Sequence, residues 1–131
     1  MGKERVRITR AGHAYTPERT VNFEARLAYA AQQAMGQRAL FDGPLMVAVE
    51  AFMPVAKSKP NRYRTAALAG QIRPTKKPDW DNVGKMLDAL NLIVWTDDAQ
   101  IVDGRVIKWY SDRPRLVVSV RPINHGEGVF S

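Results

Sequence analysis

The strongest constraint on the fold is an apolar run, LMVAVEAFM, at positions 45–53, which is closed at both ends by proline. Gly43 and Pro44 precede the run, Pro54 follows it, and Glu50 is its one charged residue. A short apolar run between turn residues predicts a strand that lies in the interior of a sheet. The rest of the chain therefore has to supply neighbouring strands and the elements that cover them.

Shorter patterns on both sides of this strand predict helices and further strands. Alternating charged and apolar residues indicate strands, whereas Ala-, Gln- and Glu-rich runs that begin at a cap residue and stop at glycine indicate helices. In chain order we expect a strand over 5–9, a helix over 17–35 capped by Thr16, the central strand, a helix over 61–68, a helix over 81–91, a short strand over 92–95, a turn over 96–100, and strands over 101–110 and 115–121. This alternation predicts a mixed α/β (α+β) fold, in which helices pack on a mixed sheet of about four strands.

The composition is that of an ordinary globular protein. The 131 residues are 45% hydrophobic and 25% charged, which suffices for one core. We expect a single domain over residues 1–121 and a mobile C-terminal tail over 122–131. No apolar run approaches the roughly 20 residues that span a bilayer, and the N-terminus lacks a secretion signal, so we expect a cytoplasmic protein without a membrane partner.

Two absences narrow the chemistry. The chain has no cysteine, which excludes disulfides and thiolate catalysis. Its two histidines, His13 and His125, are far apart in the sequence, which argues against a histidine-based metal site and against a serine–histidine pair.

Positive charge is distributed unevenly. Twenty Lys and Arg against 13 Asp and Glu give a net charge of +7, which favours a polyanionic partner. We predict DNA contacts from two basic segments, which comprise Lys3, Arg5, Arg7, Arg10, Lys57, Lys59, Arg62, Arg64, Arg73, Lys76 and Lys77. Five of the 13 acidic residues then fall within positions 79–98. Two interpretations stay open: a basic surface that leads to an acidic pocket, or a solvated basic loop beside a few helix caps.

The segment KKPDWDNVGKMLDAL, residues 76–90, concentrates carboxylates. On a helix, Asp81, Lys85 and Asp88 form one polar stripe, opposite an apolar face that packs on the sheet. Asp79 lies two residues before Asp81 in an extended segment, so both carboxylates can point to one place in front of the helix. Convergent carboxylates repel each other unless a cation or proton lies between them, and hard divalent cations bind oxygen ligands. The spacing favours a magnesium or manganese site over a helix cap at Asp81 with a surface Lys85–Asp88 pair.

A further candidate ligand lies in the turn TDDAQ at 96–100. Neighbouring side chains diverge, so Asp97 and Asp98 are not expected to have the same role. Asp97 and Gln100 have the spacing of a capping box, which leaves Asp98 as the better candidate for a metal ligand.

Lys85 and the tryptophans complete the set of singled-out residues. Lys85 lies one helical turn from Asp81, where it can contact a phosphate oxygen or the charge that develops in a transition state. Trp80 lies between two proposed ligands and is expected to point away from them, into the core or an interface. Trp95 and Trp109 are expected to pack in the sheet as strand residues.

The motifs KPDWDNVGK, DALN and DDAQIV, in this order, resemble the core signature of the RusA-type Holliday-junction resolvases, endodeoxyribonucleases of phages and prophages. The segments GKERVRITRAGHAYTPERT and RTAALAGQIRPTKKPD resemble the parts of that family that precede the signature. The resemblance implies a RusA-like fold and a homodimer, without a small-molecule cofactor, that recognises four-way DNA junctions. It implies crossover junction endodeoxyribonuclease activity, in recombination and repair, by paired symmetric nicks with Mg²⁺, for which Mn²⁺ can substitute. Carried over by position, Asp79, Asp81 and Asp98 would bind the metal, and Lys85 would be the essential basic residue of the catalytic set.

A second function stays open beside this one. A catalytically degenerate protein that binds junctions or other DNA would keep the basic surface and lack turnover. Cleavage of a synthetic four-way junction, with and without magnesium, distinguishes the two hypotheses.

Overall fold

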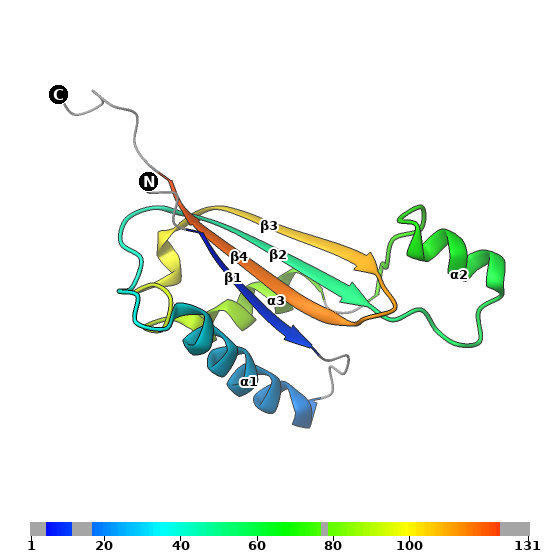
Figure 1. Cartoon of the computed structure of the whole chain (residues 1–131), viewed down its shortest axis with the longest axis horizontal. Helices are drawn as coiled ribbons and strands as arrows, with labels where there is room; N and C mark the ends of the chain where they lie inside the picture. The colour runs from blue at the N-terminus through cyan, green and yellow to red at the C-terminus, as the bar shows by residue number, and fades with distance from the viewer. Residues whose placement is uncertain (1–4, 12–16, 77–78, 124–131) are drawn as a thin grey trace.

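The computed structural model describes residues 5–11, 17–76 and 79–123, which form one mixed sheet with helices packed on it (Figure 1). In chain order the elements are β1 (Val6–Ala11), α1 (Pro17–Met35), β2 (Leu45–Met53), α2 (Asn61–Leu68), α3 (Trp80–Met86), the short 3₁₀ helices η1 (Leu87–Leu90) and η2 (Asp98–Gln100), β3 (Ile101–Tyr110) and β4 (Arg115–Pro122). The predicted mixed fold with a four-stranded sheet is confirmed. Thr16 and residues 124–131 of the expected tail lie outside the described residues.

The apolar run at 45–53 forms β2, and β2 lies inside the sheet, whose strand order is β1-β4-β2-β3. It pairs with β3 in parallel and with β4 in antiparallel orientation. Every second residue from Leu45 to Ala51 is buried, whereas the residues between them are partly exposed. Burial with a period of two means that one face of the strand contacts the core and the other faces away from it.

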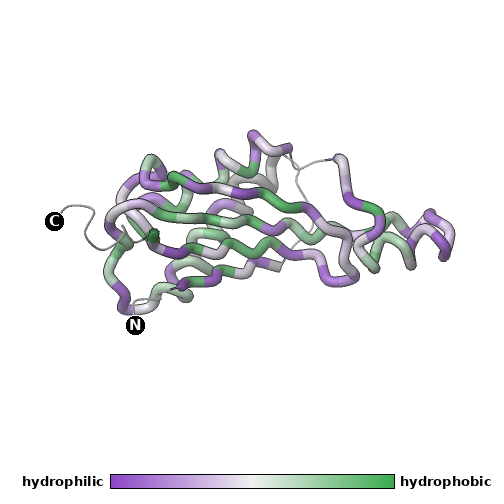
Figure 2. Tube along the Cα trace, turned by 90° about the horizontal axis from the view of Figure 1, so that it is seen from above, coloured by the Kyte–Doolittle hydropathy of each residue, from purple (hydrophilic) through white to green (hydrophobic). Residues whose placement is uncertain are grey.

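The core lies on one face of the sheet, beneath α1 and α3. Leu27 and Ala31 of α1 and Val83 and Met86 of α3 are buried in the same cluster as the inward-facing strand residues. Figure 2 shows that apolar residues follow the strands, whereas α2 projects beyond the end of the sheet and mixes polar and apolar residues. No helix in the described part of the chain is long and apolar enough to cross a membrane.

The strands β3 and β4 are consecutive in the chain and do not pair with each other. The connection over 111–114 carries the chain across the end of β2, where the Ser111 N–H donates to the Met53 carbonyl at 2.8 Å. β2 therefore lies between two strands that follow each other in sequence. This strand order depends on contacts between distant segments of the chain, so local patterns in the sequence do not predict it.

Two predictions around the carboxylate segment are wrong. The helix expected over 81–91 is α3 followed by η1, because the backbone leaves the α-helical hydrogen-bond pattern at Leu87. The strand expected over 92–95 is a tight turn, in which Leu92 has a φ of 68° and is 71% exposed. The turn buries Trp95 completely, and the Trp95 indole N–H donates to the Asn91 side-chain oxygen at 2.7 Å.

Candidate active site

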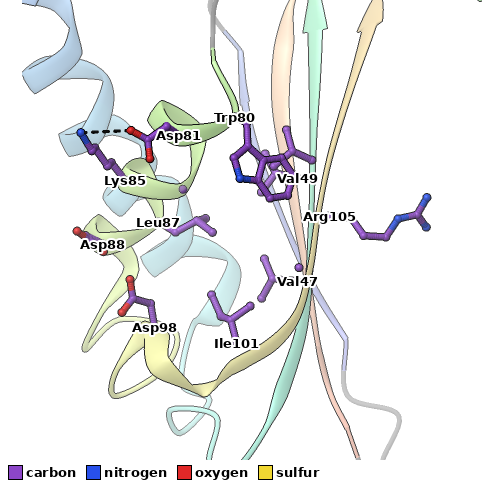
Figure 3. Close-up of a pocket in the computed structure, with 13 residues that line it drawn as sticks. Val47, Val49, Trp80, Asp81, Lys85, Leu87, Asp88, Asp98, Ile101 and Arg105 are labelled. Carbon is purple, nitrogen blue, oxygen red and sulfur yellow. Dashed lines mark ion pairs between the residues drawn. The ribbon is translucent and has the colours of Figure 1, made fainter.

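A cavity of about 360 Å³ opens between α3, η1, η2 and the face of the sheet formed by β2 and β3 (Figure 3). Its lining residues are Val47, Val49, Trp80, Asp81, Gly84, Lys85, Leu87, Asp88, Asp98, Ile101, Gly104, Arg105 and Val106. Charged residues of the helical segments line one side, and aliphatic residues line the side of the sheet (Figure 3). We call this cavity the acidic pocket, because three aspartates line it.

Three consecutive short elements bring these aspartates to one side of the pocket. Asp81 lies in the first turn of α3, Asp88 in η1, and Asp98 at the start of η2. Asp81 and Asp88 are seven residues apart, about two helical turns, so they share a face even though the second turn tightens to 3₁₀ geometry. The polar stripe predicted from the sequence therefore faces the pocket.

The predicted capping box fixes the position of Asp98. The Asp97 side chain accepts a hydrogen bond from the Ala99 N–H at 3.1 Å, and the Gln100 side chain accepts one from the Asp97 N–H at 3.1 Å. The Gln100 amide also donates to the carbonyls of Phe41 and Gly43, in the segment that leads into β2. Asp97 is thus used in local structure, and Asp98 remains to line the pocket, as the spacing indicated.

Asp98 lies in an environment that disfavours its charge. Hydrogen bonding to Asp88, followed by partial burial and hydrogen bonding to Asp97, raises the pKa of Asp98 from 3.8 to about 6. Carboxylates in such close contact are stable together only when a proton or a cation offsets their charge. At neutral pH a cation on this side of the pocket would therefore reduce the repulsion between these carboxylates.

This arrangement predicts how folding stability depends on pH in the absence of divalent ions. Because folding raises the pKa of Asp98, the stability from its proton is fully present below pH 4 and is lost as the pH rises through about 6. Asp98→Asn should therefore raise the free energy of unfolding at pH 7, by on the order of 1 kcal/mol after allowance for solvent screening, and should have little effect at pH 4. Urea denaturation in chelator at the two pH values measures this, with the exposed Asp103→Asn as the control. An Asp98→Asn protein that is less stable than wild type at pH 7 would contradict the proposed repulsion.

Lys85 lies at the rim of the pocket beside Asp81. Its Nζ atom is 3.6 Å from an Asp81 carboxylate oxygen, and the two side chains are 71% and 80% exposed (Figure 3). An ion pair this exposed contributes well under about 1 kcal/mol to stability. Both groups can therefore exchange their mutual contact for a ligand at little cost.

Asp79 and Trp80 lie differently from the sequence-based expectation. The helix begins at Trp80, so Asp79 is the extended N-cap residue, exposed and without a side-chain capping bond, and it is not among the residues that line the pocket. The extended-chain alternation that aligned Asp79 with Asp81 ends where the helix begins. Trp80 lines the pocket and is 66% exposed, so packing in the core, one of its two expected roles, is wrong, whereas packing at an interface stays a prediction.

Comparison with known proteins matches residues 1–121 to the family model described as endodeoxyribonuclease RusA. The chain belongs to the RusA family. The resemblance inferred from the KPDWDNVGK, DALN and DDAQIV motifs is thereby confirmed. A RusA family member is an endodeoxyribonuclease, and branched DNA is the substrate class associated with this family. The chain is also similar to YqaN of Bacillus subtilis (strain 168), an uncharacterized protein, with 36% identity over 115 residues that cover 86% of this chain and 80% of YqaN.

The carboxylates that line the pocket are of the donor type that agrees with divalent metal use by a nuclease of this family, although they are not gathered into a metal site. Within residues 5–11, 17–76 and 79–123, no three Asp, Glu, His or Cys side chains converge closely enough to hold a metal ion. The acidic side offers carboxylate oxygens alone, the donor type that Mg²⁺ and Mn²⁺ prefer. The contact between Asp88 and Asp98 raises the pKa of Asp98, so a positive charge beside this pair would favour the ionised carboxylates.

The structure divides the predicted DNA-binding residues of this RusA chain between two edges of the sheet. Arg5, Arg7 and Arg10 lie on or beside β1 at one edge, and Arg7 pairs with Ser119 on the face opposite to the core. Lys57, Lys59, Arg62, Arg64, Arg73 and Lys76 lie on and around α2, near the end of β3 at the other edge. Lys3 and Lys77 lie outside the described residues. One chain therefore does not join the two basic segments into a single surface.

Several basic side chains of the α2 region are held by specific contacts. The Arg73 guanidinium lies 3.7 Å from the Trp109 ring centroid and donates to the Lys108 carbonyl at 2.7 Å. The Lys59 ammonium lies 4.7 Å from the Tyr63 ring centroid. These cation–π contacts orient the two cations, and oriented cations suit a surface that contacts phosphates.

Proposed function

We propose that the chain is a metal-dependent, structure-selective endodeoxyribonuclease that resolves four-way DNA junctions by paired symmetric nicks. The observation that carries this proposal is the acidic pocket, in which Asp81, Asp88 and Asp98 gather beside Lys85 in a chain of net charge +7. A basic protein that collects carboxylates at one cavity has a strong physical reason to bind a cation there. Family membership directs that chemistry to DNA phosphodiesters.

This proposal assigns a role to the three aspartates and the lysine on the acidic side of the pocket, and to Asp79 beside it. Asp81 and Asp98 bind the cation, Asp88 completes the carboxylate set, and Asp79 contributes from the N-cap of α3 when DNA and metal are present. A divalent cation, when bound, polarises water and offsets the negative charge that develops on the phosphate. Lys85 exchanges its exposed contact with Asp81 for a phosphate oxygen and stabilises the same charge.

A cleavage assay tests this proposal directly. We expect a labelled four-way junction to be nicked on two opposing strands in Mg²⁺ or Mn²⁺, and a linear duplex of the same sequence to stay intact. Ca²⁺ should support binding with little cleavage, because its looser coordination does not enforce the geometry of the reaction. Undiminished cleavage in excess chelator would refute metal dependence. Tight junction binding without cleavage in any of these metals would instead support the catalytically degenerate alternative.

The paired nicks require two pockets, so we propose that the active form is a homodimer. The described residues of one chain supply one acidic pocket, and a two-fold symmetric pair would present two pockets to the symmetric arms of a junction. Pairing would also bring basic segments from opposite sheet edges of two chains onto one DNA-binding surface.

Sedimentation equilibrium and salt titration test this assembly. We expect twice the 14.7 kDa chain mass at micromolar concentration. Junction affinity should fall steeply with salt, with a log–log slope of about −0.9 for each phosphate neutralised, and replacing Lys76 and Lys77 by Gln should flatten the slope. A monomer that still makes paired nicks would contradict the dimer, and salt-independent binding would contradict the basic surface.

A further inference from the structure

The exposed indole of Trp80 is the feature of the acidic pocket that metal chemistry does not use. Trp80 is the first residue of α3 and is 66% exposed, although large aromatic side chains are usually well buried. It lines the pocket on the side of the sheet, near Val49, and lies apart from the row of carboxylates (Figure 3). A side chain in this position would contact a group that enters the pocket next to the metal or phosphate bound at the carboxylates.

The pocket has two walls of opposite character. The acidic wall carries Asp81, Asp88, Asp98 and Lys85 on the helical segments (Figure 3). The other part of the lining, which we call the apolar wall, consists of Trp80 and Leu87 from the helical segments, Ile101 and Val106 from β3, and the buried Val47 and Val49 from β2. Arg105 belongs to the same stretch of β3, but its side chain points away from the cavity (Figure 3). The apolar wall therefore presents no cation of its own to a phosphate.

A cation and a phosphate leave the apolar wall without a ligand. Both interact with charged or polar groups, and burying either against aliphatic side chains is unfavourable. The cavity volume of about 360 Å³ is within the range of sites that enclose small organic groups. The group that completes the pocket must be flat enough to stack on an indole, apolar on its faces, and attached to the same strand as the phosphate.

We propose that Trp80 and the apolar wall receive an unstacked nucleobase of the strand whose phosphate lies at the acidic wall; this inference rests on the proposed nuclease function. Nucleobases stack on tryptophan with little dependence on sequence, because every base has a π face. Removing a base from its stack costs least where pairing is already interrupted, as at a branch point. In this inference the acidic wall binds a phosphate of one strand, and the apolar wall binds the base next to that phosphate.

Such a pocket would favour branched DNA over a continuous duplex. The basic surface, by contrast, attracts the phosphates of both. In a continuous duplex the base beside each phosphate is stacked and paired, and its entry into the pocket requires disruption of the helix. At a branch point that cost is largely removed, so the phosphates near the branch are presented preferentially to the carboxylates. Trp80 would set which phosphodiester is aligned for cleavage.

Photo-crosslinking of the full chain tests this contact without relying on catalysis. A four-way junction, a linear duplex and a single-stranded oligonucleotide each carry one 5-iododeoxyuridine, placed at the branch point, within an arm or in the single strand, and all are irradiated with the protein in chelator. We expect a crosslink to Trp80, located by mass spectrometry, for the branch-point and single-strand probes and not for the arm probe. Trp80→Ala should weaken junction binding by about tenfold or more, and Trp80→Phe should restore much of it. Tyr29→Ala removes another exposed aromatic residue, 63% exposed on α1, and should have no effect.

A second variant fills the pocket without altering the indole. Gly104 lines the pocket and pairs with Val47, and a Cβ added there would lie 3.5 Å from the Ile101 side chain, an ordinary contact. Gly104→Val should therefore fold normally. We expect it to reduce the yield of the Trp80 crosslink by about tenfold or more, because the added side chain occupies the space of the base. Circular dichroism and thermal melting check the fold of both variants.

The outcomes separate this inference from the proposed function. Efficient junction cleavage with no crosslink at Trp80, and unchanged binding by Trp80→Ala, would overturn the base pocket alone. Loss of dimer mass in Trp80→Ala together with an absent crosslink would assign Trp80 to contact with a second copy and would also overturn it. A Trp80 crosslink to single-stranded DNA from a protein that cleaves no junction would support the pocket and overturn the proposed function.

Discussion

Replacing Asp81 or Asp98 by asparagine is expected to reduce junction cleavage by more than about 100-fold, because each replacement removes an anionic oxygen donor from the proposed metal site. Junction binding should stay the same or become tighter, since a smaller negative charge in the pocket repels phosphate less. Asp79→Asn is predicted to have the same effect, and it tests a candidate ligand that does not line the pocket in the structure. Single-turnover cleavage and gel-shift titration with the same labelled junction measure the two properties.

Asp97→Asn is the matched control for Asp98→Asn. Asparagine caps a helix about as well as aspartate does, so the capping box with Gln100 should survive and cleavage should fall only mildly. If Asp98→Asn cleaves at a near-normal rate, Asp98 is not a ligand of the metal ion. Equal losses at Asp97 and Asp98 would show that the division between a capping and a metal-binding carboxylate is wrong.

Lys85→Met should separate catalysis from stability. We expect cleavage to fall by about 10²- to 10³-fold, the range found when one group that stabilises transition-state charge is removed. The free energy of unfolding should change by less than about 0.5 kcal/mol, because the Lys85–Asp81 pair is exposed on both sides. Rapid-quench cleavage and urea denaturation of the same preparation give both values.

Lys85→Arg supplies the control for that substitution. It keeps the positive charge and should recover part of the lost rate. If Lys85→Met cleaves at the wild-type rate, Lys85 is a surface lysine with no catalytic role. If the variant instead unfolds readily, the contact with Asp81 has a structural importance that its exposure does not indicate.

Elements bounded by proline or glycine could be predicted closely from the sequence. The bounds of α1, β2 and α2 agree with the expected ranges, because proline or glycine lies at or near their ends, and Gly36 after α1 and Gly70 after α2 have the left-handed φ that often ends a helix. The bounds of β3 also agree, although its expected limits came from the TDDAQ turn before it and the Arg113–Pro114 connection after it. The order of the strands could not be predicted, since it depends on contacts between segments that are distant in the chain.

The predictions failed where tertiary packing overrides a local apolar pattern. The run at 92–95 has strand-like composition, yet burial of Trp95 and the positive φ of Leu92 make it a turn. Within the candidate site, helical spacing placed Asp81 and Lys85 on one stripe, and the capping box singled out Asp98. The placement of Asp79 and Trp80 depended on the residue at which the helix begins, and a local pattern determines that only to within a residue or two.

The insertion of β2 between β3 and β4 has a consequence for how the protein folds. Strands joined by a short connection often form a hairpin early, but here the two neighbours in sequence cannot pair in the native sheet. A β3–β4 hairpin would be a kinetic trap that has to open before β2 can enter. The β2–β3 pairing also closes a long chain loop, so we expect it to form late. Val47 and Val49 of β2 and Val106 of β3 belong to that pairing, so the cavity would be completed only in the last stage of folding. A newly made chain would therefore lack the proposed nuclease site until its sheet is complete.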